Sequence, residues 1–388
     1  MANLKGYIYG KKRIICVITA FLTFLSGCGL VPDGSISWEK QEADSVVIEN
    51  NHAKGSLGEG IEVDADISGT ELKEWKEWKE CTAVPRQFDD AAAERISRYF
   101  LGDSAYLYGT YDNYEAADGT SIYEYKKKSG EYVVTYSGTI GFNTPVCINN
   151  YYSSFVMPDK LLDEDTLNEL FPLDSLDGFD KNNVINSFKT ICSDLNIEIS
   201  DNIRIHALDK DSANQIRKEN DWLTRDKHEN LLPDWTRDTE AYFILAPLSL
   251  NGIELPTQNT SSSTGSTYTS YVYAFYNRQG LIQFTASGMY EISDEKAVTD
   301  VHSINDVLNF LATNYSYLAG INMNVAISDI KLTYIVKKYE LDKKYKVLPT
   351  WVCREDTVIK TSKDGKEEEK TRTKYLYIDA QTMTSFAN

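Results

Sequence analysis

The chain has 388 residues and is acidic, with 58 Asp and Glu against 40 Lys and Arg and a formal net charge of −18. A body this acidic repels nucleic acid and anionic lipid headgroups, which excludes a nucleic-acid-binding protein and attachment to a membrane by charge. The apolar and charged fractions, 42% and 25%, are ordinary for a globular chain, and the length predicts two or three domains.

Residues 1–27 have the pattern of an export signal. A basic cluster at 11–13 precedes an apolar run over 14–25, which is shorter than the roughly 20 residues that a membrane-spanning helix needs. The run ends in Leu25, Ser26, Gly27 and Cys28. These four residues resemble the lipobox of bacterial lipoproteins, and the resemblance implies cleavage before Cys28 and a diacylglyceryl group on its sulfur.

The lipobox resemblance also implies a location, the outer face of the cell membrane of a bacterium of the Gram-positive type. Loss of residues 1–27 removes four basic residues and no acidic one, so the net charge falls from −18 to −22. Because such a body is repelled by anionic headgroups, the lipid must supply the attachment, and two acyl chains hold a protein stably where one does not.

Four cysteines remain besides the signal and the lipidation site, and they leave two alternatives open. Outside the cytoplasm they could form two disulfides, in any of three connectivities. A domain of this size also folds without such bonds, with buried free thiols. No pair has metal-ligand spacing. The four residues are Cys81, Cys147, Cys192 and Cys353.

The polar stretch 28–60 is rich in Gly, Ser, Glu and Asn and predicts a flexible tether. Order is expected to begin near residue 61, because apolar residues alternate with acidic ones over 61–67, as in a half-buried strand. An N-terminal α+β module is therefore predicted over 61–180.

The next segment of that module predicts a helix followed by strands. Residues 88–101 have one apolar face, Asp89 or Asp90 is positioned to cap the helix, and Gly102 to end it. From 104 to 150 the composition predicts strands and turns. Tyrosines recur along this segment, at positions 106, 108, 111, 114, 123, 125, 132 and 136.

A middle module is predicted over 181–299 and a C-terminal module over 300–388. Both begin with an amphipathic helix and continue with antiparallel strands, which is the clearest internal regularity of the chain. The predicted elements of the middle module are helices over 183–195 and 212–222, strands over 203–208 and 241–250, an exposed loop over 256–267 and a hairpin over 271–285. Those of the C-terminal module are a helix over 303–315, strands over 327–339, 347–355 and 374–379, and a charged loop over 361–373.

The C-terminal module resembles the PepSY-like domain of the YycH and YycI regulatory proteins, in which a helix packs on an antiparallel sheet. The resemblance covers residues 303–383, and Met383 departs from it by replacing the usual Gly. It rests on Leu332-x-Tyr334, Leu348-Pro349-x-Trp351 and Tyr375-x-Tyr377-Ile378-Asp379-Ala380-x-Thr382. The wider layout also resembles an uncharacterised family of clostridial lipoproteins, through motifs at 61–66, 101–103 and 280–284. The fold class predicted is thus α+β, with two or three modules of a helix packed on an antiparallel sheet.

Short motifs for metal chemistry are incomplete. His228-Glu229 lacks the second histidine of H-E-x-x-H, because Leu232 stands in its place. Asp64 and Asp66 begin like a calcium loop, but Trp75 stands where the twelfth residue should be Glu. The four histidines are scattered, and no metal or cofactor is expected.

Motifs for nucleophilic or acid–base catalysis are equally weak. Ser293 and Lys296 match S-x-x-K without the two partner motifs that β-lactamases and penicillin-binding proteins carry. The pair Asp163-Glu164 could serve a glycosidase, but sequence spacing does not show the separation of the carboxyl groups. The sequence therefore predicts no enzymatic activity.

The leading expectation is a non-enzymatic lipoprotein that regulates or interacts with a membrane sensor, anti-sigma factor or peptidase in the cell envelope. The membrane is contacted through the diacylglyceryl group on Cys28, and no nucleic acid is bound. The alternative is a surface lipoprotein that binds glycan or peptide through the Tyr-rich segment from Tyr106 to Tyr152.

Overall fold

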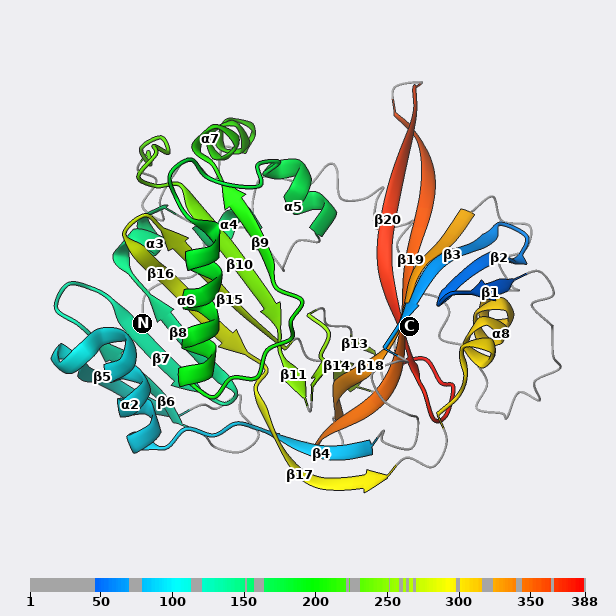
Figure 1. Cartoon of the computed structure of the whole chain (residues 1–388), viewed down its shortest axis with the longest axis horizontal. Helices are drawn as coiled ribbons and strands as arrows, with labels where there is room; N and C mark the ends of the chain where they lie inside the picture. Colours follow the sequence, from blue (N-terminus) through cyan, green and yellow to red (C-terminus); the bar gives the residue numbers. More distant parts are fainter. Residues whose placement is uncertain are drawn as a thin grey trace, which may run out of the picture.

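The structure, a computed structural model, contains two large sheets and the helices that cover them (Figure 1). The predicted α+β class is confirmed, with more strand than helix. The residues described are 46–69, 79–112, 121–150, 152–156, 164–220, 223, 231–250, 252–257, 261–262, 265–267, 270–297, 301–315, 324–339, 344–363 and 366–386.

Sheet A has the strand order β1-β2-β3-β18-β19-β4-β17, with β20 paired to β19 and the small hairpin β13–β14 paired to β18. The β3–β18 pair is parallel, and the other described pairs are antiparallel. The strands are β1 Val47–Glu49, β2 His52–Gly58, β3 Ile61–Ser68, β4 Lys79–Pro85, β13 Ser261–Ser262, β14 Gly265–Thr267, β17 Tyr290–Ala297, β18 Asn324–Tyr339, β19 Lys344–Lys363 and β20 Lys366–Asp379.

Sheet B is antiparallel with the order β5-β6-β7-β8-β16-β15-β10-β9. Its strands are β5 Tyr106–Asp112, β6 Ser121–Lys126, β7 Tyr132–Tyr136, β8 Thr139–Asn143, β9 Arg204–Leu208, β10 Ala241–Pro247, β15 Tyr271–Asn277 and β16 Gly280–Ser287. A separate two-stranded hairpin consists of β11 Ser249–Leu250 and β12 Ile253–Glu254.

Helices cover both faces of sheet B, and this explains why β10 is apolar at every position. Tyr242 and Ile244 pack in one core with α6, whereas Phe243 and Leu245 pack in a second core with α4, α5 and α7. All seven residues of β10 are buried. The helices are α2 Asp90–Leu101, α3 Pro145–Asn150, α4 Tyr152–Val156, α5 Glu164–Leu170, α6 Lys181–Asp194 and α7 Lys210–Glu219, with the 3-10 turn η2 Gly102–Ser104 after α2.

Local capping signals position the predicted helices correctly. Asp89 accepts a hydrogen bond from the backbone N of Ala92, and Gly102 ends α2 with φ of 70°, a value that glycine adopts without strain. In the first turn of α8 (Ile304–Tyr315), the Asp306 carboxylate accepts hydrogen bonds from the backbone N and the hydroxyl of Ser303. The helices predicted over 88–101, 183–195 and 303–315 are confirmed by α2, α6 and α8.

The tether prediction is wrong for its last part, because residues 47–58 form β1 and β2. Asn50 and Asn51 both have positive φ, 51° and 58°, and make the two-residue turn typical of a tight hairpin. Ala53 and Leu57 are buried against the core of sheet A. The polar composition of this stretch indicated a tether, although the Asn50-Asn51 pair is typical of a hairpin turn.

Two predicted loops also form strands. Within 256–267, β13 and β14 form a hairpin that pairs with β18 through backbone groups, which any Ser- or Thr-rich segment can supply. Within 361–373, β19 and β20 continue as a long two-stranded ribbon that projects from the body (Figure 1). The antiparallel register of the two strands continues to the pair Lys363 and Lys366.

The predicted modules do not correspond to separate sheets. Sheet A combines β3 and β4 from 61–180, β17 from 181–299 and β18–β20 from 300–388, while sheet B combines strands from the first two ranges. In the C-terminal range a helix is followed by antiparallel strands, as predicted, but these strands share a sheet with segments that are distant in the sequence. Parallel pairing of β18 with β3 requires such a long connection.

Candidate functional site

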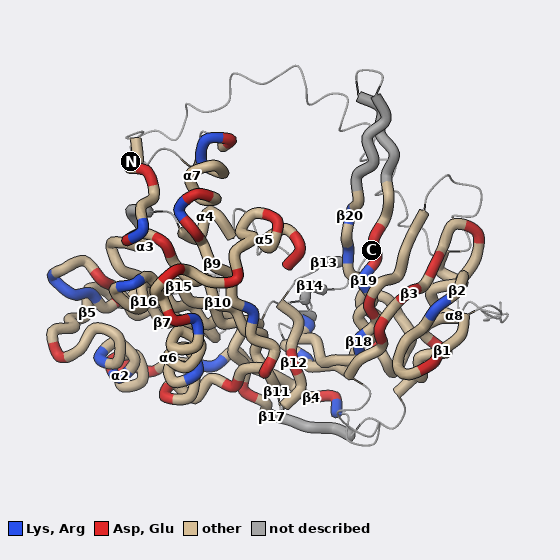
Figure 2. The backbone as a smooth tube through the Cα atoms, turned by 45° about the horizontal axis from the view of Figure 1, so that its top comes forward, with Lys and Arg blue, Asp and Glu red and all other residues tan. Residues whose placement is uncertain are grey.

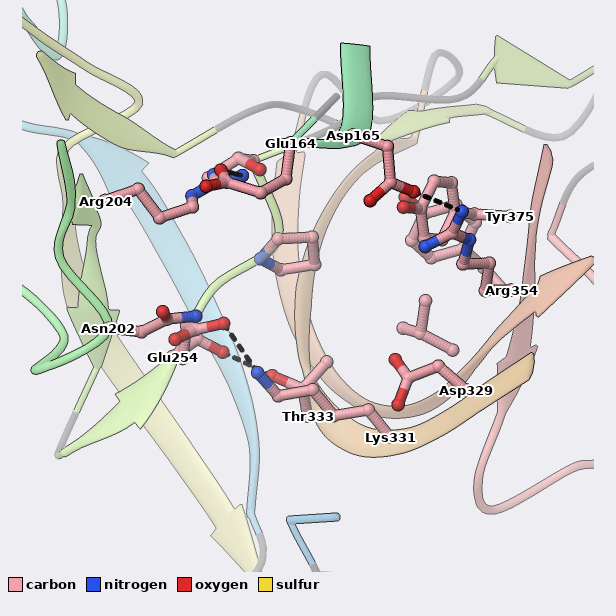
Figure 3. Close-up of a pocket in the computed structure, with 14 residues that line it drawn as sticks. Glu164, Asp165, Asn202, Arg204, Glu254, Asp329, Lys331, Thr333, Arg354 and Tyr375 are labelled. Atoms are coloured by element: carbon pink, nitrogen blue, oxygen red, sulfur yellow. Dashed lines mark hydrogen bonds and ion pairs between the residues drawn. The ribbon is translucent and has the colours of Figure 1, made fainter. Parts of the chain in front are cut away.

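A pocket of about 260 Å³ lies between sheet A and the elements at the near edge of sheet B. Figure 3 shows its charged side chains pointing toward one another from the two sides. The lining residues come from α5, from β9 and the loop before it, from β12 and the loop after it, and from β18, β19 and β20. They are Glu164, Asp165, Asn202, Arg204, Glu254, Pro256, Thr257, Asp329, Lys331, Thr333, Val352, Arg354, Tyr375 and Tyr377.

Strand alternation places the polar residues of sheet A on this side. Side chains two apart along β18 share a face, so Asp329, Lys331 and Thr333 line the pocket, while Ile330 and Leu332 pack in the core with α8. The antiparallel registers continue both rows across the sheet. Asp329 lies opposite Arg354, which lies opposite Tyr375, and Lys331 lies opposite Val352, which lies opposite Tyr377.

Two ion pairs connect the walls of the pocket. Asp165 on α5 lies 3.1 Å from the Arg354 guanidinium on β19. Glu254 on β12 lies 2.5 Å from Lys331 on β18, and its second carboxylate oxygen accepts a hydrogen bond from Ser200 at 2.7 Å. The Thr333 hydroxyl also donates to the backbone carbonyl of Glu254. These contacts hold the two sheets across the pocket.

The third acidic residue, Glu164, is directed toward sheet B. It lies 3.3 Å from the ring of His206 and 3.5 Å from Nη1 of Arg204. Burial is the main cause that lowers the pKa of His206, with Glu164 acting in the opposite direction. Arg204 Nε is buried and has no hydrogen-bond partner among the residues that the structure describes.

Asp329 is the fourth carboxylate of the pocket, and Figure 3 shows it pointing into the open space with no interaction marked. Within the described part of the chain it forms no ion pair. Partial burial raises its pKa above the usual value, while Lys331 and Arg354 act in the opposite direction. The lining therefore carries four carboxylates against three cations, which suits binding of a polar, charged molecule.

Charge is otherwise distributed over both halves of the molecule, and neither half is uniformly basic or acidic (Figure 2). Among the described residues no group of three His, Cys, Asp or Glu could hold a metal ion. Within the same residues, none of the helices has both the length and the apolar character that crossing a membrane requires.

The lipobox residues Leu25, Ser26 and Gly27 and the predicted lipidation site Cys28 lie outside the described residues. So do Asp163 and His228. Glu164, the second member of the acidic pair considered in the sequence, does line the pocket. For residues 293–296, the structure places the backbone in β17.

The four cysteines retained in the described chain are all buried, and Cys147, Cys192 and Cys353 are free thiols. Cys147 lies 2.9 Å from Gln283 Oε1, and burial raises the pKa of both Cys147 and Cys192 to about 12. Of the two alternatives, the structure has buried thiols. Their raised pKa values make them poor nucleophiles, because the thiolate is the reactive form.

The Tyr-rich segment is not one surface. Tyr106, Tyr108 and Tyr111 on the edge strand β5 are 45–54% exposed, whereas Tyr123 is buried and packs in the core with α2. Tyr152 is fully buried, and its hydroxyl donates to the carbonyl of Thr239 at 2.7 Å. Among the described tyrosines of this segment, the large exposed ones are therefore those of β5.

The two aspartates that begin like a calcium loop contact basic residues of β2. The His52 ring lies 2.8 Å from both Asp64 and Asp66, and Lys54 lies 2.7 Å from Asp64. Hydrogen bonding to Asp66 is the main cause that raises the pKa of His52. These are cross-strand pairs on an exposed face of the β2–β3 hairpin.

Comparison with known proteins gives the fold alone. No family model matches the chain, and no curated protein matches it. The structure is similar to the crystal structure of an uncharacterized protein from Eubacterium rectale, with a TM-score of 0.64. The match covers 87% of this chain and 94% of that chain at 12% sequence identity. That similarity shows a shared fold and indicates no activity.

Proposed function

We propose that this protein is a lipid-anchored, extracytoplasmic and non-enzymatic binding protein that takes a small charged ligand into the pocket between its sheets. The observation that carries the proposal is a polar pocket whose walls come from both sheets and are joined by two ion pairs. Ligand sites occur preferentially at such junctions, where a few convergent polar groups fix the orientation of the ligand.

Thermal shift and calorimetric titration with amino acids, short peptides, amines, carboxylates and wall sugars test the proposal. Val352 lines the pocket on β19, so Val352→Trp should fill it and abolish the ligand-induced rise in melting temperature. Val352→Ala, which leaves the pocket open, is the matched control and should retain that rise. The proposal fails if no class of compound binds at millimolar concentration.

Anchoring belongs to the same proposal and has its own test. Cys28→Ala should release the exported protein from the membrane fraction into the medium, because the residue that accepts the lipid is lost. Cys16→Ala, within the signal, should leave the protein membrane-bound. Membrane retention of the Cys28→Ala protein would contradict the anchor.

A PepSY-like unit over 303–383 remains part of the proposal. It is supported by α8 and the three antiparallel strands β18, β19 and β20 that follow it. One face of these strands forms a common core with α8.

A second candidate function is regulation of a membrane partner through a protein surface. The observation that favours it is the edge strand β5, where Tyr106, Leu107, Tyr108 and Tyr111 are all about half exposed. Such exposed apolar side chains mark interaction sites when they cluster. Leu107→Asp should abolish crosslinking to an envelope protein in native membranes, whereas Leu173→Asp, at an equally exposed site on the loop after α5, should not.

A further inference from the structure

We propose that the ligand of the pocket is a zwitterion, a free α-amino acid or a short peptide, whose ammonium group contacts Asp329 and whose carboxylate contacts Arg204. This inference rests on the proposed binding function of the same pocket. Its starting observation is that, among the described residues, Asp329 forms no ion pair and Nε of Arg204 has no hydrogen-bond acceptor.

The anionic side chain is Asp329, and both cations that could neutralise it are engaged elsewhere. Lys331 shares its face of β18 but lies 2.5 Å from Glu254. Arg354 lies directly opposite in the register but contacts Asp165 at 3.1 Å and Asp356 at 3.4 Å. A carboxylate without a direct ion-pair contact in a half-buried site is costly, and an ammonium group would supply that contact.

The cationic side chain is Arg204 on β9, whose guanidinium has five N–H donors. Nη1 lies 3.5 Å from Glu164, a long contact, and Nε has no acceptor in the described part of the chain. A ligand carboxylate is the group that matches a guanidinium in charge and in planar shape. Figure 3 shows Arg204 and Asp329 on opposite walls of the pocket, so the proposed ligand would lie between them with one charged end toward each.

The size and the remaining lining restrict the ligand further. A cavity volume of about 260 Å³ lies just below the range of roughly 300–1,000 Å³ typical of drug-sized ligands, so one or two residues fit. Tyr375 and Val352 supply apolar surface for a side chain. Because the lining has one more carboxylate than cations, a basic amino acid such as lysine should bind more tightly than glutamate.

Calorimetric titration of the full mature protein tests the inference with L-lysine, glycine, glycylglycine, L-glutamate, propylamine and propionate as probes. We expect L-lysine or a peptide to bind, and propylamine and propionate to bind at least tenfold more weakly. Asp329→Asn should weaken lysine binding at least tenfold, and Arg204→Gln should weaken it by a similar factor. Asp103→Asn, a fully exposed carboxylate on η2, is the control and should change nothing.

The melting temperature without ligand separates an effect on folding from an effect on ligand binding in the same variants. Asp329→Asn removes a half-buried charge that has no ion-pair partner in the described chain, so the melting temperature without ligand should not fall. Equal binding of propylamine and lysine, or unchanged lysine binding in Asp329→Asn, would overturn the zwitterion inference while the pocket remained a binding site. Absence of binding by every probe and by the wider compound panel would instead overturn the proposed function.

Discussion

The two faces of β18, β19 and β20 carry different side chains, one face apolar and the other charged, although these side chains come from alternate residues of the same strands. On the face covered by α8, Ile330, Trp351 and Cys353 are buried in the main core. On the other face, one residue away along each strand, Asp329 and Arg354 line the pocket. The residues that a strand face carries thus match the layer that covers it. The helix α8 presents apolar side chains to one face, and the opposite wall of the pocket presents carboxylates to the other.

Trp351 should show the largest effect of any change on the α8 face. It is 2% exposed, and its indole N donates to the carbonyl of His302 at 3.0 Å. Trp351→Ala should lower the free energy of unfolding by about 3–5 kcal/mol, the usual cost of deleting a buried aromatic ring. Trp351→Phe should cost less, because it keeps most of the packing. Chemical denaturation checks both, and a cost of Val352→Ala as large as that of Trp351→Ala would remove the contrast between the faces.

Glu355 is the exception on the α8 face and should give an intermediate effect. Its carboxylate is fully buried and is contacted by the Tyr315 hydroxyl and by Lys374 at 2.6 Å. Glu355→Ala leaves the Tyr315 hydroxyl without its acceptor and should cost about 1–3 kcal/mol. Glu355→Gln keeps an acceptor and should cost less.

The same residue should give a pH dependence of known sign. Burial is the main cause that raises the pKa of Glu355 above 4.5, although Lys374 acts in the opposite direction. A raised folded-state pKa means that the favourable contribution is complete below the unfolded pKa and is lost as the pH rises through the folded value. The free energy of unfolding, measured from below the unfolded-state pKa to above the folded-state pKa, should fall in the wild type and not in Glu355→Gln. Identical pH profiles for the two proteins would contradict this prediction.

The Arg354–Asp165 ion pair across the pocket should give the smallest effect. Arg354 and Asp165 are 32% and 73% exposed, so a double-mutant cycle with alanine should give a coupling of about 0.2–1 kcal/mol, falling with added salt. The Arg98–Glu94 pair on α2, also exposed, is the matched control. A coupling energy of several kcal/mol would contradict this prediction, because it would equal the stabilisation expected from a buried side chain of the core.

Sequence reasoning succeeded where the signal was local. The alternation of apolar and acidic residues over 61–67 identified β3, and the cap at Asp89 with Gly102 identified α2. The hairpin predicted over 271–285 is formed by β15 and β16. It failed where pairing depended on a distant partner, as for β13 and β14 on β18. The Asn50-Asn51 turn was a local signal, but the polar composition around it outweighed the pair.

The pocket itself was not predicted, because its walls come from α5, β12 and β18, which are widely separated in the chain. One signal was available in part. Asp329, Lys331 and Thr333 alternate with apolar residues in a strand that the sequence did predict, which indicates a polar face beside a core face. Tertiary structure alone determines which acidic residues face these side chains across the pocket and which of those acidic residues form an ion pair.

The interleaved topology determines how this protein can be dissected. Residues 300–388 produced alone would keep α8 and β18–β20 but lose β3 and β4, which pair with β18 and β19 in the whole chain. Two long strands would then present unsatisfied backbone groups to other molecules, a condition that leads to aggregation. We therefore expect residues 300–388 not to fold as an autonomous fragment, and single substitutions in the intact chain are the better way to assign roles to residues.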